Sequence, residues 1–534
     1  MLYFIPAWYD ENQWREREEV WYRPKTSMEA DDTAKEIQLF YRRNLCPLKI
    51  ILLSSAPNFR HFLHRLGLIH VEYWSIFDAM QCIRGKQLNS FSYYDLAWPE
   101  GTEFHLTPFV AIASLHGERI ALIQFGEGGN LIRIERYEEG KEVSEISYDD
   151  RGFISSIRTL DQGKVIREDF LDNMGKVRFS LLSGGRVEIN SDLPFYELET
   201  GSGRIQKSYQ KLQYASVEDV IGEVFSSYLE QLDAESVFCI ANHDRHAALL
   251  QKALKKRKTI VTVYEARKKV CNSQVAMDFL AGADQIITDS EENEKIVRQA
   301  LIRKGIPEDL FGHRIKRISP FSVRHETSLC QTLPVKNLLL PVDLLSESDF
   351  QEAILQLAFF LKTHPSVRVH LFTRSAEYWA EERILNRVEE ILSKASFPPE
   401  WSIQEDSSAE NRTEEGESSQ KFFADVCRDS MSIHRCMLLQ RVLVDLSKRP
   451  DQFLQVSAVS LGIPQICKGK TVFLEDGQNG ILLKKMEDLP SALSYYLDQL
   501  SHWNDARVLA YRLGERYSSE DIEKSWKEVI AGLD

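Results

Sequence analysis

Two histidines and an aspartate stand close together at a position where chemistry could occur. In the string NHDRH, His243, Asp244 and His246 have the side-chain types that bind metal ions or exchange protons. The string follows a strand-like run, SVFCIAN, and precedes a helix-like run, so a simpler role is to cap the first turn of that helix. We favour Asn242 or Asp244 as the cap and predict no metal site.

Aromatic residues crowd the N-terminal segment. Trp8, Tyr9, Trp14 and Trp21, together with Tyr22, could form a platform on which the C–H groups of a sugar ring stack, or could contact a partner protein. Packing in a core or an interface is the more common fate of such side chains, and we favour it. Contact with a glycan or partner through these residues is the weaker hypothesis.

The composition excludes several classes of function. The chain has 534 residues, 43% of them hydrophobic, and this length predicts at least two domains. Its formal charge is −14, from 80 acidic and 66 basic residues, so we expect no nucleic-acid partner. The eight cysteines form no C-x-x-C pair, which favours reduced thiols, and we predict no cofactor.

Hydropathy points to a cytoplasmic protein. No run approaches the roughly 20 apolar residues that span a bilayer. The first residues also lack a basic leader followed by an apolar core. We therefore expect neither a membrane span nor a general secretion signal.

Strand-like and helix-like patterns alternate at first, and a different pattern interrupts them. Residues 1–108 and 200–330 predict one Rossmann-like domain in two parts, and Ser216-x-x-Asp219 opens an amphipathic helix in the second part. Residues 109–199 show short alternating strands with Gly-containing turns, which predict an inserted antiparallel meander of six to eight strands. A separate β-domain is the alternative interpretation of this segment.

A second alternation of strands and helices spans residues 336–505 and predicts another Rossmann-like domain. Within it, residues 402–420 are polar and acidic, which is typical of a mobile loop. Residues 506–534 have a helical pattern, and we expect this helix to pack back on the first domain. The predicted fold class is α/β, with two doubly wound domains and an antiparallel insertion.

Three strings in the second domain carry a resemblance. SAVSLGIPQI, LEDGQNGILL and EDLPSALSYYLDQL resemble the donor-binding half of the GT-B glycosyltransferases, where a G-x-P turn is followed by a D-G-x-N-G turn and a helix. In this chain, Asp476 and Asn479 belong to the second turn. The resemblance implies a GT-B fold of two Rossmann-like domains.

The charged groups that the same resemblance implies are missing. Active members have two glutamates eight residues apart beside the sugar nucleotide, and Arg449 and Ser457 occupy those positions here. They also have an arginine and a lysine that neutralise the leaving diphosphate, and an ungapped alignment places Asp343 and Ser348 there. Because an aspartate would repel a diphosphate, the resemblance implies a degenerate donor site and no catalysis.

The N-terminal strings narrow the family further. YFIPAWYDENQWREREEVWYRP, LIHVEYWSIFDAMQ and LAWPEGTEF are similar to the first of the accessory secretory (Asp) proteins of the accessory Sec system. This resemblance runs along nearly the whole chain. It implies partnership with the second and third accessory secretory proteins, the accessory SecA motor and a glycosylated serine-rich repeat adhesin.

Our leading hypothesis from sequence is a non-catalytic component of accessory Sec export. Such a component would assemble with the other accessory secretory proteins and escort or modify the adhesin, with glycan binding as a further role. It would be cytoplasmic, partly at the inner face of the membrane through the translocon. The alternatives are an active GT-B glycosyltransferase and a stabilising subunit of one.

Overall fold

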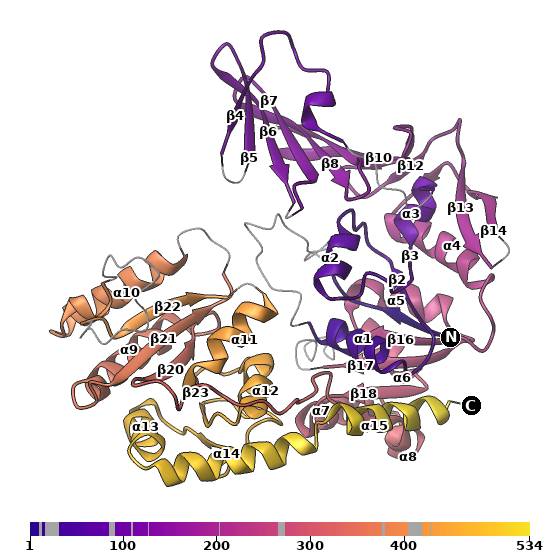
Figure 1. Cartoon of the computed structure of the whole chain (residues 1–534). Helices are drawn as coiled ribbons and strands as arrows, with labels where there is room; N and C mark the ends of the chain where they lie inside the picture. Colours follow the sequence, from indigo (N-terminus) through magenta and orange to yellow (C-terminus); the bar gives the residue numbers. More distant parts are fainter. Residues whose placement is uncertain are drawn as a thin grey trace. The chain divides into compact units, whose positions relative to one another are not determined.

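Figure 1 shows the computed structural model of the chain. It describes residues 1–9, 13–15, 31–84, 91–107, 110–126, 128–201, 203–264, 273–375, 380–403, 419–427 and 429–533. Trp21 and residues 404–418 of the predicted loop 402–420 lie outside the described residues. No helix among the described residues is both long enough and apolar enough to cross a bilayer.

The chain divides into two compact units, which are described separately. The first unit comprises Met1–Tyr22, Phe40–Lys316 and Leu533–Asp534, and the second comprises Arg23–Leu39 and Arg317–Gly532. The division falls within helix α1 (Asp32–Arg43).

The first unit contains a parallel sheet. The pairs that join β18, β17, β16, β1, β2 and β3 are parallel. Neighbouring residues along these strands, such as Phe4 and Ile5, are both fully buried, as expected when helices cover both faces of a sheet. The strand order is β19 (Ile315–Arg317), β18 (Gln285–Thr288), β17 (Lys258–Val263), β16 (Val237–Ala241), β1 (Leu2–Ile5), β2 (Leu48–Leu52) and β3 (Tyr73–Ser75).

Amphipathic helices supply the covering layers of this sheet. Ser216 caps α4, accepting a hydrogen bond from the Asp219 N–H at 3.3 Å, so the helix start predicted there is confirmed. The helices after α1 are α2 (Phe59–Arg65), α3 (Ile76–Gln81), α4 (Val217–Leu229), α5 (Asp244–Ala253), α6 (Gln274–Ala281), α7 (Glu291–Arg303) and α8 (Glu308–Phe311), with 3-10 turns η2 (Tyr93–Asp95) and η4 (Gly312–Arg314).

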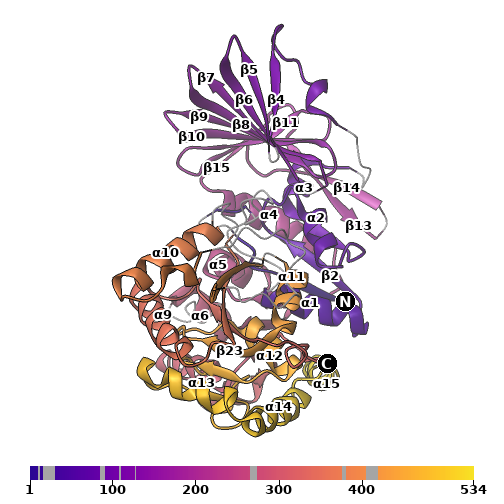
Figure 2. The ribbon, with the colours of Figure 1, turned by 60° about the vertical axis from the view of Figure 1, so that its left-hand side comes forward.

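An antiparallel sheet of ten strands belongs to the same unit, and Figure 2 shows its strands fanning out from the end that holds α3 and α4. It has more strands than the six to eight predicted, because residues 103–106 and 213–214, outside the 109–199 segment, also pair with it. Its order is β15 (Gln213–Tyr214), β12 (Val187–Ile189), β11 (Val177–Leu182), β10 (Lys164–Leu171), β9 (Phe153–Asp161), β8 (Lys141–Asp149), β7 (Leu131–Glu138), β6 (Glu118–Phe125), β5 (Val110–Leu115) and β4 (Glu103–Leu106). A separate hairpin joins β13 (Phe195–Thr200) and β14 (Gly203–Ser208).

The turns of this sheet explain its hairpin geometry. Glu139 and Gly140 have φ of 49° and 74°, and Gln162 and Gly163 have φ of 48° and 76°. Two consecutive residues with positive φ form the tight turn whose twist matches that of the flanking strands. Successive strands therefore lie side by side in chain order.

The second unit is built on a six-stranded parallel sheet. Leu338 and Leu340 pack in the cluster with α9, α10 and α13, whereas Leu339 packs in the cluster with α11 and α12. Because successive side chains of a strand point to opposite faces, the sheet is covered on both sides. The order is β22 (Phe422–Val426), β21 (Val367–Thr373), β20 (Lys336–Pro341), β23 (Gln440–Asp445), β24 (Gln465–Cys467) and β25 (Gly480–Leu482).

Its helices end with a pair near the C-terminus. The helical pattern predicted there corresponds to two helices, α14 and α15, and packing of this segment on the first domain stays a prediction. The helices are α9 (Glu347–Leu361), α10 (Ala380–Lys394), α11 (Ser430–Leu438), α12 (Gln452–Leu461), α13 (Leu489–Leu497), α14 (Leu500–Glu515) and α15 (Ser519–Ala531), with 3-10 turns η5 (Pro399–Trp401) and η6 (Met486–Asp488).

A buried arginine joins the antiparallel sheet to the rest of the first unit. Arg151, in the turn after β8, donates two hydrogen bonds to Asp78 of α3 at 2.8 and 2.9 Å. It donates two more to Asp149 at 2.6 and 2.8 Å, and its side chain is 8% exposed. We call Arg151, Asp78 and Asp149 the arginine clamp. Gln81 of α3 reinforces it by donating to the carbonyl groups of Ser155 and Leu171.

The clamp predicts a large loss of stability when its cation is removed. Arg151→Met leaves two carboxylates facing each other without their shared cation, so the free energy of unfolding should fall by about 3–5 kcal/mol. Urea denaturation followed by circular dichroism measures this change. Arg84→Met is the matched control, because Arg84 is 67% exposed where it pairs with Glu197, and it should change the same quantity by less than about 1 kcal/mol. Equal effects of the two changes would contradict the role of the clamp.

Candidate functional site

The carboxyl ends of the parallel strands meet at one edge of the second unit's sheet, where α/β proteins commonly bind ligands. Asp343 follows β20 and Arg374 follows β21. Asp445 is the last residue of β23, the loop after it runs to Asp451, and Lys468 follows β24. We call this region the carboxyl edge. The resemblance to glycosyltransferases places the degenerate donor site here.

Asp343 is bound to the protein itself. Its carboxylate accepts a hydrogen bond from the Thr373 hydroxyl and another from the Arg374 backbone N–H at 2.8 Å, so it ties together the loops that follow β20 and β21. Ser348 is exposed in the first turn of α9, and its hydroxyl oxygen lies 3.1 Å from that of Ser346, the cap of this helix. Neither residue is a cation that could neutralise a diphosphate.

Arg374 and Lys468 also lie at the carboxyl edge and each has an anionic partner, whereas Lys448 and Arg449 in the loop after β23 are exposed. The Arg374 guanidinium lies 2.7 Å from the carboxylate of Asp451, and the Lys468 ammonium lies 2.7 Å from that of Asp349. The hydrogen bond from Lys468 holds the pKa of Asp349 below its usual value. A phosphate group would have to displace these carboxylates to reach either cation.

The loop after β23 is organised by Asp445, which is 1% exposed. Its carboxylate accepts hydrogen bonds from the Ser447 hydroxyl at 2.6 Å and from the Asp451 backbone N–H at 2.8 Å. Burial raises the pKa of Asp445 to about 6, although these hydrogen bonds act in the opposite direction. Arg449, which the resemblance aligns with one of the two glutamates of active members, is exposed in this loop.

Ser457, which the resemblance aligns with the other glutamate, lies inside a helix. Ser457 is in the middle of α12, and its hydroxyl donates to the carbonyl oxygen of Phe453 one turn earlier at 2.7 Å. A serine bonded to its own helix offers no charged acceptor to a ribose.

The D-G-x-N-G turn uses its polar side chains to hold its own shape. Asn479 is fully buried, accepts from the Glu475 N–H at 2.7 Å and donates to the Phe473 carbonyl at 2.9 Å. Asp476 accepts from the Leu482 N–H at 2.8 Å. At Gly480, a Cβ atom would lie 2.4 Å from the Gln465 carbonyl oxygen, so a side chain does not fit.

Trp8 and Tyr9 of the N-terminal segment are packed in the first unit. Trp8 is 2% exposed and lies against Phe62, with ring centroids 4.9 Å apart. Tyr9 is 3% exposed, and its hydroxyl lies 2.9 Å from Nδ1 of His246. Their burial favours the packing interpretation over an exposed sugar platform.

His246 is fixed by contacts at both ring nitrogens. Its Nε2 lies 2.8 Å from the Ala241 carbonyl oxygen, which can only accept, so Nε2 donates, and Nδ1 lies 2.9 Å from the Tyr9 hydroxyl. The predicted cap of α5 was wrong, because neither Asn242 nor Asp244 fills this role. Instead His243 caps the helix, since its own Nδ1 accepts from the Arg245 N–H at 3.1 Å. Throughout the described ranges, no three metal-binding side chains gather closely enough to hold an ion.

A cavity of about 530 Å³ lies in the first unit between the segment around Trp14 and strands β10 and β11. We call it the sheet cavity. Its apolar lining includes the rings of Trp14, Phe77, Phe170 and Phe179. The rings of Phe170 and Phe179 stack with their centroids 4.6 Å apart and are only 3% and 1% exposed, so they form the packed floor behind the cavity.

One end of the sheet cavity carries a carboxylate, Glu218, with two donors. Glu218 accepts from the Trp14 indole N–H at 2.7 Å and from Arg245 at 3.3 Å. Its side chain is still 43% exposed, so its remaining lone pairs face solvent. This end could accept hydrogen bonds from hydroxyl groups of a ligand.

The other end carries Glu168 between two arginines. Arg15 contacts one carboxylate oxygen, and Arg158 lies 3.2 Å from the other. Burial acts to raise the pKa of Glu168, but the two arginines outweigh it and hold the pKa below its usual value. The group is therefore ionised at neutral pH and fixes Arg15 against β10.

Sequence reasoning missed the two ion pairs at the carboxyl edge and the charged ends of the sheet cavity. Arg374 and Lys468 each come directly after a buried strand, and that position was the available signal. Their partners Asp451 and Asp349 are distant in the sequence, and no local pattern joins them.

The raised pKa of Asp445 predicts a pH-dependent stability. The folded chain binds this proton more tightly than the unfolded chain, so stability from Asp445 is present at low pH and is lost as the pH rises through about 6. The free energy of unfolding of the wild type minus that of Asp445→Asn should therefore grow by about 1 kcal/mol when the pH falls from 7 to 5. Chemical denaturation at both pH values measures this difference. The Ser447→Ala variant keeps the Asp445 carboxyl group, so its stability should still depend on pH. If the difference in free energy of unfolding between the wild type and Asp445→Asn stays constant with pH, the raised pKa of Asp445 is contradicted.

Comparison with known proteins identifies relatives of this chain. A curated relative from Streptococcus gordonii, an accessory Sec system protein, is 26% identical over 99% of both chains. The chain is similar to a structure from Streptococcus pneumoniae described as accessory secretory protein 1, 2 and 3, with 24% identity, TM-score 0.79 and coverage of 100% of this chain and 99% of that chain.

A structure of the pneumococcal O-GlcNAc transferase GtfA with UDP and GlcNAc is also similar, at 13% identity and TM-score 0.69, over 100% of this chain and 98% of that chain. The predicted α/β fold, with Rossmann-like parallel sheets as in GT-B glycosyltransferases and an added antiparallel sheet, is confirmed. The family model of accessory Sec system protein 1 matches residues 1–530, and the chain therefore belongs to this family of accessory Sec system proteins, the first of the Asp proteins.

Proposed function

We propose that this chain is a non-catalytic component of the accessory Sec export system, and that it assembles with the second and third accessory secretory proteins. Family membership supports the first part, and the pneumococcal structure of three such proteins supports the second. The chain acts in the cytoplasm and partly at the inner face of the membrane, where the accessory SecA motor receives the serine-rich repeat adhesin.

The observation that carries the absence of catalysis is the internal pairing at the carboxyl edge. Arg374 and Lys468 are neutralised by Asp451 and Asp349, and Asp343 is bound to the loop after β21. Transfer from a sugar nucleotide needs unpaired positive groups where the diphosphate leaves. In this chain, the residues of this edge instead stabilise the loops that they belong to.

We further propose that the sheet cavity binds glycans of the adhesin. Val165 and Leu181 of the lining offer apolar surface, and Glu218 offers a charged acceptor to sugar hydroxyl groups. Because Glu218 also orients Trp14 and Arg245, a ligand would meet a site whose side chains are already positioned.

Titration with nucleotide sugars tests the proposed loss of catalysis. Calorimetry with UDP-glucose and UDP-N-acetylglucosamine should give no binding heat, because Arg374 and Lys468 are already paired with Asp451 and Asp349. Co-expression with the second and third accessory secretory proteins should yield a stable complex on size exclusion. Binding of either nucleotide sugar that is lost in Lys468→Met would favour the transferase alternative, and failure to form a complex would contradict the proposed assembly.

Surface plasmon resonance with a serine-rich peptide tests the glycan proposal. The chain should bind the peptide modified with N-acetylglucosamine and not the unmodified peptide, and Glu218→Gln should weaken binding about tenfold through loss of a charged hydrogen-bond acceptor. Glu235→Gln is the matched control, because Glu235 is 75% exposed, pairs with Lys258 and does not line the cavity. Equal binding of both peptides, or equal effects of both changes, would rule out glycan recognition at this cavity.

A further inference from the structure

Two cations converge at the start of neighbouring strands in the second unit. Arg368 lies in β21, and Lys421 is the residue before β22. The guanidinium of Arg368 donates to the carbonyl oxygen of Pro365 at 3.1 Å, and the ammonium of Lys421 donates to the same oxygen at 2.7 Å. Within the part of the chain that the structure describes, neither cation forms an ion pair with a carboxylate. We call Arg368 and Lys421 the cation pair.

The position of the cation pair is electrostatically unfavourable. Both side chains are half-buried. Burial lowers the pKa of Arg368, and burial together with the charge of Arg368 lowers the pKa of Lys421. The carboxylate of Asp425, further along β22, lies 2.6 Å from Nδ1 of His370. An anionic group from outside the chain would relieve the repulsion between the two cations.

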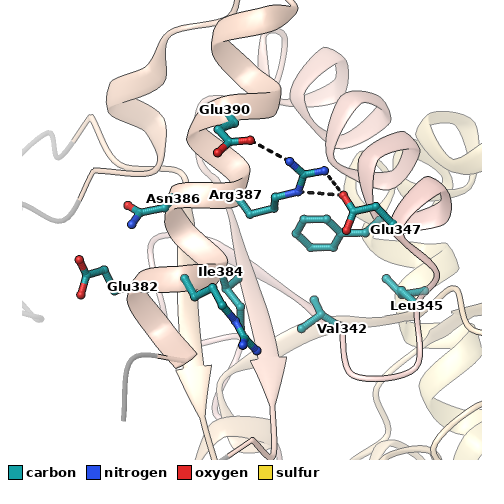
Figure 3. Close-up of a pocket in the computed structure, with 10 residues that line it drawn as sticks. Val342, Leu345, Glu347, Glu382, Ile384, Asn386, Arg387 and Glu390 are labelled. Atoms are coloured by element: carbon teal, nitrogen blue, oxygen red, sulfur yellow. Dashed lines mark hydrogen bonds and ion pairs between the residues drawn. The ribbon is translucent and has the colours of Figure 1, made fainter. Parts of the chain in front are cut away.

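A cation on helix α10, which packs against β22, shows the contrasting arrangement. A groove of about 860 Å³ lies between α10 and the start of α9. In this groove, Arg387 donates to Glu347 at 2.8 Å and to Glu390 at 2.8 Å (Figure 3). Arg387 thus has carboxylate partners within the chain, whereas the cation pair shares only an uncharged carbonyl group.

The cation pair lies beside an open edge of the sheet. β22 is the last strand in the sheet order, and no described strand pairs with its outer side. The carbonyl of Lys421 accepts from the Val369 N–H at 2.8 Å, and the Cys427 N–H donates to the Thr373 carbonyl at 2.9 Å. Because backbone groups alternate in direction along a strand, residues 421, 423, 425 and 427 form the bonds to β21.

The backbone groups of the intervening residues point away from the sheet. These residues are Phe422, Ala424 and Val426. The side-chain amide of Gln420 donates to the Phe422 carbonyl at 2.9 Å and so occupies one of the outward groups. The N–H and C=O groups of Ala424 and Val426 remain open to a strand from another chain.

The side chains beside this edge select what such a strand would carry. Lys421 and Phe423 lie on the same face of the sheet, because they are two residues apart. Phe423 is half-buried and stacks on His370, with ring centroids 5.3 Å apart. A strand that pairs with β22 would place alternate side chains on this face. An acidic side chain next to the cation pair and an apolar one next to Phe423 would be complementary.

We propose that the cation pair binds a carboxylate of an extended acidic segment of a partner protein, and that this segment adds a strand to the open edge of β22. The N–H groups of an arginine match the two oxygens of a carboxylate, and main-chain hydrogen bonds to a sheet edge supply affinity. The proposal goes beyond the export role proposed above and does not depend on it.

A blocked heptapeptide, Thr-Val-Thr-Glu-Thr-Val-Thr, tests the site because its glutamate and valines share one face of a strand in either direction. Fluorescence anisotropy with an uncharged dye on the peptide measures its binding to the full chain. The peptide should bind at least about tenfold more tightly than the same peptide with glutamine in place of glutamate, because glutamine cannot form a charge-assisted hydrogen bond.

A double variant tests the cations directly. Arg368→Met with Lys421→Met should weaken binding of the glutamate peptide at least about tenfold, because it removes both positive charges and keeps side chains of similar length. Lys255→Met with Lys256→Met is the matched control: it removes two cations at exposed positions after α5 and should leave binding unchanged. Equal binding of the two peptides, or equal effects of the two double variants, would overturn the proposal.

A third variant tests the added strand. Ala424→Pro removes a backbone N–H that points outward and keeps the hydrogen bonds between β21 and β22, and circular dichroism checks that the chain remains folded. Binding of the glutamate peptide should fall at least about fivefold. Binding that depends on the cation pair but not on this change would overturn strand addition.

Two further outcomes would overturn the proposal in favour of another role. If the peptide does not bind and the double variant at the cation pair self-associates in light scattering, the cations protect the edge from pairing. If vesicles of phosphatidylglycerol bind through the cation pair and the peptide does not, the cations serve a membrane surface. Each outcome leaves the proposed assembly with the other accessory secretory proteins untouched.

Discussion

The arginine clamp is the contact on which the first unit depends. The buried guanidinium of Arg151 donates hydrogen bonds to Asp149 at the end of β8 and to Asp78 on α3. These four bonds fix the antiparallel sheet to helix α3. Phe170 of β10 and Phe179 of β11 lie next to Phe77 of α3, and all three line the sheet cavity. A buried ion pair of this kind gives little net stability, but it strongly disfavours any arrangement that separates its members.

In the second unit, charged groups join loops to one another at the edge of a sheet. At its carboxyl edge, ion pairs and hydrogen bonds connect loops that follow neighbouring strands, and the carboxylates there bind groups of the same chain. The unit shares its fold with a transferase solved with UDP and GlcNAc. In this chain, the bonds at the carboxyl edge serve the loops themselves.

The fold was largely predictable because it depends on local patterns. Buried strands followed by amphipathic helices indicated both parallel sheets, and Ser216 marked the start of α4. The strand number of the antiparallel sheet was underestimated because β4 and β15 are short and lack a clear alternation. The site was less predictable, since Lys468 meets Asp349 across 119 residues of sequence. The cap of α5 was missed because histidine is an unusual cap, and its use here depends on a ring orientation that sequence does not encode.

The turn that contains Asn479 and Gly480 has a consequence for how such sequences are classified. Its asparagine is buried and bonded to two backbone groups, and its last glycine leaves no space for a side chain, so both residues are required by shape alone. A protein that has lost catalytic activity can therefore retain this motif, because a substitution in it would destabilise the fold. Motif searches that rely on this turn would group inactive chains with enzymes. The charged groups that contact a substrate are the better markers of activity, because the shape of this turn does not depend on them.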